Sequence, residues 1–342
     1  MKKLAPLAVI ATLLSTTALA DVKISGTTEF YYKDVDSQIA ANNGDSMGNT
    51  DSEIKFDFST KTETGINFGY IVELATDSDS STTTDESSLY IEGSAGKVVL
   101  GGNDAVTDNF GIGEQDIMSE EVAGTYTSSS IQSNAGEKTY GADTNKISYF
   151  APAIGGLTVG VSYLDGGTAG DTDSTSFGGR YQLGDNVTIG YTNGQQEVSG
   201  AIDNESQNLG IKAVIGDITA IAAVSKVEEA DEDIDTVGFG ASYKLNADTT
   251  IAVSTMESED SLDVSGTEKE NLKQHMAEVS YSIAPGLTGY VNYTDYEYKN
   301  GGEASTDDDG SVIQFKIAAH SRKNKHGGFP INSTITCIKS KK

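Results

Sequence analysis

The chain has 342 residues, of which 51 are acidic and 23 basic, and its formal net charge at pH 7 is −28. Because phosphate binding needs a basic surface, this balance argues against nucleic acid as a partner. The 38 glycines, 16 tyrosines and only 4 prolines are typical of long strands with tight turns rather than of a disordered chain. No internal apolar run reaches the roughly 18 residues of a transmembrane helix, although alternating strands can cross a membrane without such a run.

Residues 1–20 carry the three parts of a secretory signal peptide. Lys2 and Lys3 supply the positive start, residues 4–14 the apolar centre, and Ala18-Leu19-Ala20 the small-residue cleavage site. We therefore predict that the chain is exported and that the mature protein begins at Asp21.

From residue 21 onward, apolar and polar residues alternate in sixteen segments that we predict to be β-strands. These segments are 22–32, 54–58, 66–74, 87–93, 97–102, 146–150, 157–163, 176–183, 187–191, 209–213, 218–224, 237–243, 250–253, 277–283, 287–293 and 311–317. The connections alternate between seven short turns, such as 94–96, and eight longer polar stretches, such as 36–51. Short turns on one side, long loops on the other and an even number of strands are typical of transmembrane β-barrels.

The alternating pattern alone does not say which face meets water. In the segment 54–58, for example, Ile54, Phe56 and Phe58 share one face, and Lys55 and Asp57 share the other. A soluble sandwich buries the apolar face, whereas a membrane barrel turns it toward lipid. The loop asymmetry, the predicted signal peptide and the single cysteine, which excludes disulfides within the chain, favour the barrel. Tyr and Phe at strand ends indicate aromatic girdles at the membrane interfaces or ordinary cross-strand pairs.

One connection, residues 103–144, is far longer than loops in compact domains usually are. It is acidic and rich in Gly and Ser, yet it carries apolar side chains that could pack against another surface. These are Phe110, Ile112, Ile117, Met118, Val122 and Tyr126. We expect that surface to be the inside of the barrel.

The order of strand, turn, strand, long acidic loop and strand over 89–93, 99–102, 147–152 and 155–157 resembles the general porins of Gram-negative bacteria. The likeness is strongest to the sixteen-stranded trimeric type and extends from about residue 21 to about residue 318. It implies an all-β transmembrane antiparallel β-barrel of sixteen strands, with the long third loop folded into the lumen. It further implies a homotrimer in the outer membrane, in contact with lipid and lipopolysaccharide, whose water-filled channel passes small hydrophilic solutes and ions by diffusion.

The resemblance also implies a constriction, because the family sets carboxylates of this loop across from basic residues of the wall. The loop acids are Asp104, Asp108, Glu114, Asp116, Glu120 and Glu121. By alternation, the inward basic residues of the wall are Lys23, Lys55 and Arg180. Alternatively, some of these acids cap a short helical turn in 115–122 or face bulk water.

The charge of the predicted barrel favours cations. Eight of the 23 basic residues lie in 1–20 or beyond Ala318, and none of the 51 acidic residues does, which leaves a charge of −36 on residues 21–318. Charged side chains at a constriction select ions, so we expect a cation-favouring channel.

The sequence shows no catalytic constellation, no metal-ligand spacing and no cofactor motif, so an enzyme is not expected. The acidic runs 228–233 and 307–309 are interpreted as solvated loops, with loose binding of Ca²⁺ or Mg²⁺ as the alternative. Two other functions stay open at this point. One is a secreted soluble acidic β-rich adhesin or Ca²⁺-binding surface protein, and the other, disfavoured by the missing catalytic cluster, is a secreted β-barrel enzyme.

Residues 319–342 depart from the rest of the chain. The alternation stops after Ile317, and the remainder is basic and aperiodic and holds the only cysteine, Cys337. Porins of the resembled type end at their last strand with an aromatic residue. We consider a periplasmic extension attracted to anionic surfaces and a translated non-native end, and the break in composition favours the second.

Overall fold

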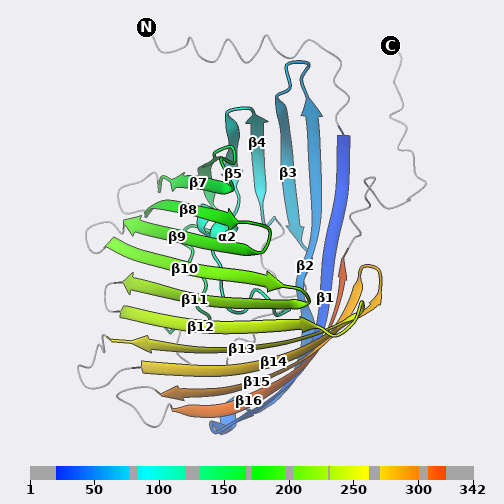
Figure 1. The fold of residues 1–342 in the computed structure, drawn as a ribbon, viewed down its shortest axis with the longest axis vertical. Coiled ribbons are helices and arrows are strands. Elements are labelled where there is room, and N and C mark those ends of the chain that lie inside the picture. Colours follow the sequence, from blue (N-terminus) through cyan, green and yellow to red (C-terminus); the bar gives the residue numbers. More distant parts are fainter. Residues whose placement is uncertain are drawn as a thin grey trace.

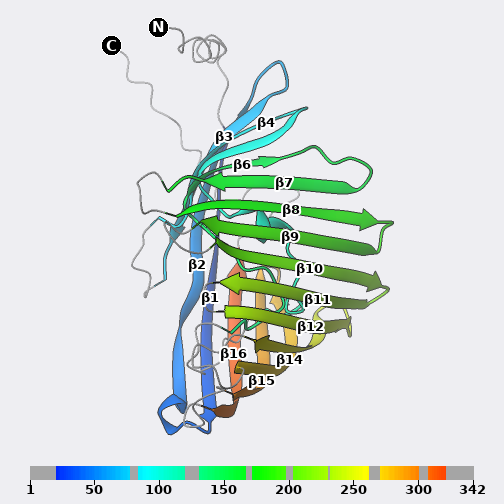
Figure 2. The same cartoon turned by 90° about the vertical axis from the view of Figure 1, so that its left-hand side faces the viewer.

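The structure is a computed structural model that describes residues 21–77, 84–119, 131–166, 172–197, 203–229, 232–261, 270–299 and 307–320. Over these residues sixteen antiparallel strands form one closed barrel (Figures 1 and 2). The predicted fold class is therefore confirmed. The predicted signal peptide and the basic tail beyond His320 lie outside the described residues. None of the helices in the described ranges is long and apolar enough to cross a membrane.

Each predicted strand corresponds to one strand of the structure. The elements, in chain order, are β1 (Asp21–Ser37), η1 (Ala40–Asn42), β2 (Gly44–Lys61), β3 (Asn67–Ala75), β4 (Ser87–Gly93), β5 (Gly96–Gly102), α2 (Val106–Phe110), β6 (Asn145–Phe150), β7 (Leu157–Leu164), β8 (Asp173–Leu183), β9 (Val187–Glu197), β10 (Asp203–Ile215), β11 (Ile218–Glu229), β12 (Glu232–Lys244), β13 (Thr249–Asp260), β14 (Glu270–Ala284), β15 (Leu287–Lys299) and β16 (Asp308–His320).

Many strands run further toward the long loops than predicted. β2 begins at Gly44 rather than at residue 54, so the predicted loop 36–51 is reduced to a short connection that contains η1. The reason is that the strand is held by backbone hydrogen bonds to its neighbours, which require no apolar alternation. At the outer end of β2 both faces are mostly polar, and on β14 the apolar residues Leu272 and Met276 turn inward instead of outward, so the lipid-facing pattern ends while the strand continues.

The barrel closes between its first and last strands. β1 pairs with β16 from Thr27 opposite His320 to Ser37 opposite Gly310. The last strand therefore extends two residues past Ala318, where the predicted barrel ends. Closure pairs the first and last strands over most of their length, as a hydrocarbon environment requires, because an unsatisfied backbone group there costs several kcal/mol. Residues 21–26 of β1 lie beyond the last pair with β16 and are paired with β2 alone.

The apolar face of the sheet points outward and the polar or small face points inward. On β14, Val279 and Tyr281 are exposed on the outside, whereas Gln274 and Glu278 are buried on the inside. On β8, Phe177 is 45% exposed, while its neighbour Ser176 is 2% exposed. An exposed apolar belt around a polar interior is the arrangement of a membrane barrel and the reverse of a soluble one.

One sector of the interior is apolar. Toward the long loops, inward residues of β1 and of β11 to β16 form a buried cluster with Ile131 and Met118 of the segment between β5 and β6. The cluster consists of Val35, Ile131, Val227, Ile234, Met256, Leu272, Met276, Tyr296, Tyr298 and Val312, with Met118 packed against it. The main hydrophobic core therefore lies within the ring of strands and includes part of the long loop.

Candidate functional site

The described parts of the segment 103–144, which we call the inner loop, lie against the inside of the barrel wall. The helix α2 packs beside β7, β8 and β9 (Figures 1 and 2). Further along the inner loop, Ile112 contacts β10 and Glu114 contacts β12. Ser119 reaches β14 and β16. The outgoing limb, residues 103–119, therefore runs along the wall from β6 to β16.

A carboxylate caps α2 at its start. Asp108 Oδ2 accepts a hydrogen bond of 3.0 Å from the backbone N–H of Ala105, and Asp108 Oδ1 accepts one from the Thr139 hydroxyl. Burial raises the pKa of Asp108, and the hydrogen bond from Thr139 opposes that rise. One loop acid is thus a helix cap, and the helix is α2 at Val106–Phe110; of the stretch 115–122, residues 115–119 are described and contain no helix.

Asn208 of β10 holds both limbs of the inner loop. Its Oδ1 accepts from the N–H of Ile112 at 3.1 Å, and its Nδ2 donates to the carbonyls of Ile112 at 3.1 Å and Ala135 at 2.7 Å. The limbs also bind each other: Glu114 Oε2 accepts from Ala135 N at 2.8 Å, and Gln115 Nε2 donates to Ser133 O at 2.9 Å. The return limb, residues 131–144, is therefore joined to the outgoing limb both directly and through Asn208.

The far end of the outgoing limb is anchored by buried charged groups. Glu278 of β14 accepts from the backbone N–H and the hydroxyl of Ser119. Lys316 of β16 donates to the Ser119 carbonyl at 2.7 Å and forms an ion pair of 2.8 Å with Glu29 of β1. The ammonium also lies 5.4 Å from the ring centroid of Tyr290.

Carboxylates of the inner loop face basic residues of β8 and β10. Burial raises the pKa of Asp116, and the charges of Lys212 and Arg180 lower it. Burial also raises the pKa of Glu137 to about 7, assisted by the charges of Asp108 and Asp116. Arg180 in turn donates from Nε to the Phe110 carbonyl at 3.1 Å and from Nη2 to the Gly111 carbonyl.

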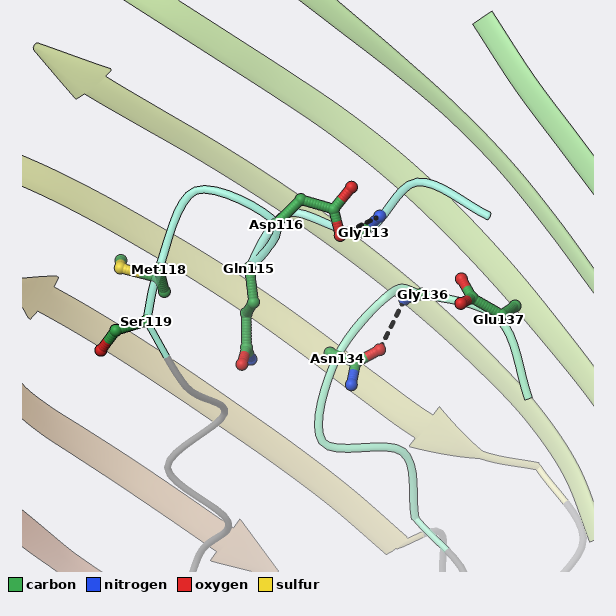
Figure 3. A pocket seen from close by; sticks show the side chains of 8 residues that line it. All are labelled: Gly113, Gln115, Asp116, Met118, Ser119, Asn134, Gly136 and Glu137. Atoms are coloured by element: carbon green, nitrogen blue, oxygen red, sulfur yellow. Dashed lines mark hydrogen bonds between the residues drawn. The ribbon is translucent and has the colours of Figure 1, made fainter. Parts of the chain in front are cut away.

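A cavity of about 260 Å³ lies between the outgoing limb and the return limb of the inner loop. Figure 3 shows Asp116 on one limb and Glu137 on the other. The lining also includes Gln115, Met118 and Asn134. Two carboxylates and two amides therefore give this surface groups that accept hydrogen bonds, and the amides can also donate them.

A second group of acids lies where the inner loop leaves β5. Glu86 Oε1 accepts from the backbone N–H of Asp104 at 2.8 Å. Glu86, Asp104 and Asp143 each bring one carboxylate oxygen within 4.8 Å of the others. Burial and the charge of Asp104 raise the pKa of Glu86, and burial also raises that of Asp143. Lys146 approaches this group and donates to the Asn103 carbonyl.

The predicted site residues have different surroundings. Asp116 lies near Arg180, whereas Glu114 is fully buried against β12 and binds the return limb. Lys55 pairs with Glu73 of β3. Lys23 is exposed on β1, opposite Asp57 in the strand register. Glu120 and Glu121 lie outside the described residues.

Several site residues were not predicted from the sequence. Lys212 and Lys316 alternate with the outward residues Ile211 and Phe315, so the rule that selected Lys55 would also have selected them. Glu278 is marked as an inward residue in the same way, because it alternates with the outward residue Val279. Glu137 carries no such signal, because the inner loop has no periodicity.

The comparisons agree with this architecture. The sequence model of the family described as Gram-negative porin matches residues 7–301. No curated protein sequence matches the chain. The in-vitro folded trimer form of OmpT, an outer membrane protein of Vibrio cholerae, is similar with a TM-score of 0.69 at 13% identity, covering 88% of this chain and 99% of that one.

Two further solved structures are similar in the same way. The anion-selective porin from Comamonas acidovorans has a TM-score of 0.69 at 17% identity, covering 89% of this chain and 100% of its own. A mutant of the Rh. blastica porin has a TM-score of 0.65 at 14% identity, covering 88% of this chain and 100% of its own. Identities this low support the fold alone, and the family model supplies the assignment. The chain belongs to the Gram-negative porin family and is an outer-membrane β-barrel channel.

Proposed function

We propose that the channel passes small hydrophilic solutes and ions by passive diffusion, favours cations and catalyses no reaction. The observation that carries the preference is the arrangement of charge in the described lumen. Two bases of the wall are paired with acids of the wall, Lys55 with Glu73 and Lys316 with Glu29. Asp116 and Glu137 of the inner loop face Arg180, and acidic residues outnumber basic ones over residues 21–318 as a whole.

The electrostatic consequence is a higher local concentration of cations. Charged groups beside a narrow aqueous path, with low-dielectric walls, focus the field and attract counter-ions. The anion selectivity of the Comamonas porin belongs to that protein, and at 17% identity its lining charges do not transfer to this chain.

The test is the reversal potential of the purified protein in a planar bilayer with a tenfold KCl gradient. We expect cation preference at low salt and a weaker preference at 1 M, because the Debye length falls from about 10 Å at 0.1 M to about 3 Å at 1 M. A reversal potential showing anion preference at low salt would refute the proposal.

We further propose that the protein is a homotrimer surrounded by outer-membrane lipid and lipopolysaccharide. The trimer form of the Vibrio cholerae protein and the exposed apolar belt, which includes Phe177 and Val279, support this assembly. The same belt disfavours the soluble adhesin, because a contiguous apolar surface of this extent is not stable in water. Sedimentation in detergent measures the assembly, and a monomeric mass would contradict it.

A further inference from the structure

We propose that a row of glycines on the inner wall determines the bore of the channel by setting how close the inner loop lies to the wall. The row, which we call the glycine track, consists of Gly160, Gly178, Gly190, Gly210 and Gly238. This inference rests on the proposed diffusion channel and names residues that determine its size selectivity.

The glycine track consists of two groups of paired positions, offset by two residues between β8 and β9, where Gly178 stands opposite Thr192 and Gly190 opposite Arg180. Gly160 of β7 is paired with Gly178 of β8, and Gly190 of β9 with Gly210 of β10. On β11, Ala223 stands opposite Gly210 on one side and Gly238 of β12 on the other. The wall therefore has side chains of at most one carbon at these paired positions.

The inner loop fills the space that these missing side chains leave. A Cβ atom added at Gly210 would lie 2.4 Å from the Ile112 carbonyl oxygen and 2.5 Å from Ile112 Cβ. One added at Gly190 would lie 2.5 Å from the Phe110 carbonyl oxygen. At Gly178 the nearest atoms belong to Phe110, the closest at 2.8 Å.

Conformation does not explain these glycines. None of the five has the positive φ that favours glycine over other residues. Glycine inside a strand weakens the strand and otherwise marks a place where another backbone approaches closely. The close approach of the outgoing limb is therefore the reason why glycine occupies these positions.

A methyl group at Gly210 must displace the inner loop, because the atoms that it meets are a carbonyl oxygen and Cβ, which no side-chain rotation can move. Ordinary contact begins at 3.4 Å, so the shift needed is about 1 Å. The wall is a closed hydrogen-bonded barrel and yields little, so the outgoing limb moves toward the pore axis. The bore narrows, and the charge of the lumen stays unchanged.

The experiment compares single-channel conductance and the entry rates of sugars of increasing size into proteoliposomes. The variants are Gly210→Ala and the matched control Gly93→Ala, whose added Cβ meets no atom within 4 Å. We expect Gly210→Ala to lower the conductance and to slow the largest permeant sugars most, with the reversal potential unchanged. Equal conductance in Gly210→Ala and wild type, or a higher conductance in Gly210→Ala, would overturn the proposal.

A second pair of variants decides the matter if Gly210→Ala does not fold, as judged by heat-modifiable electrophoretic mobility. A Cβ at Gly238 would meet the Glu114 side chain, with Oε2 at 2.3 Å, Cδ at 2.5 Å and Cγ at 2.7 Å. Gly238→Ala should therefore lower the conductance in wild type but not in a Glu114→Ala background, in which those atoms are gone. The same loss in both backgrounds, or no loss in either, would overturn the proposal. A wild-type protein that does not conduct would instead refute the proposed function.

Discussion

Replacing Lys316 with methionine should destabilise the barrel far more than the same change at an exposed lysine. The Lys316 side chain is 2% exposed and that of its partner Glu29 is 11% exposed, with 2.8 Å between Lys316 Nζ and Glu29 Oε2. Removing one member of a buried ion pair leaves the other charge uncompensated, which costs about 3–5 kcal/mol. We therefore expect Lys316→Met to lower the free energy of unfolding by about 3 kcal/mol.

Lys273 supplies the matched control. It pairs with Glu257 at 3.1 Å on the outside of the barrel, with side chains 45% and 49% exposed. An exposed pair of this kind contributes about 0.2–1 kcal/mol, so Lys273→Met should cost about 0.5 kcal/mol. Both substitutions remove one positive charge and keep a similar apolar chain, so the difference between them reports burial.

The assay is urea unfolding in lipid vesicles. The chain has no Trp and 16 Tyr, so the transition is followed by electrophoretic mobility or tyrosine fluorescence. Adding Glu29→Gln to Lys316→Met should recover part of the loss, because the uncompensated carboxylate is then gone. Equal costs at Lys316 and Lys273, or no recovery in the double variant, would refute the reasoning.

Three further predictions concern selectivity and assembly. Asp116→Asn with Glu137→Gln should reduce cation preference while the barrel stays heat-modifiable, and an unchanged reversal potential would count against these residues. Because burial raises the pKa of Glu137 to about 7, its negative charge is present above that pH and is lost below it. Cation preference should therefore fall between pH 8 and pH 5.5, and Glu137→Gln should flatten this dependence; a profile identical to wild type would exclude Glu137 as its source. Replacing the residues after Ile317 with a short ending that terminates in Phe should raise the yield of folded trimer, whereas equal yields would contradict a non-native tail.

The sequence was sufficient to predict the strands because apolar alternation marks wherever a strand meets lipid. It was insufficient for their outer ends, because there the strand continues while its apolar residues are few, as after Gly44 of β2, or turn inward, as at Leu272 of β14. The same alternation would have identified Lys212 and Lys316 as inward residues.

The partners of the inner loop were beyond prediction. Ser119 binds residues that are 159 and 197 positions away in the sequence, and nothing local specifies such a pairing. Glycines between two outward apolar residues, such as Ile189-Gly190-Tyr191 and Leu209-Gly210-Ile211, do leave a trace in the sequence. Their meaning becomes clear only once a second segment is seen to lie on them.

Lys316 also constrains the order in which the protein assembles. It joins the last strand to the first through Glu29 and holds the inner loop through Ser119. Strands so distant in sequence meet late, since loop-closure entropy must be overcome before they gain contacts. Until β16 pairs with β1, the ammonium of Lys316 lacks the carboxylate of Glu29. The facing edges of β1 and β16 then also carry unpaired backbone groups, which are costly in hydrocarbon. The anchor for the far end of the inner loop is therefore complete only when the ring closes, because Lys316 holds Ser119 and pairs with Glu29 across the same strand junction.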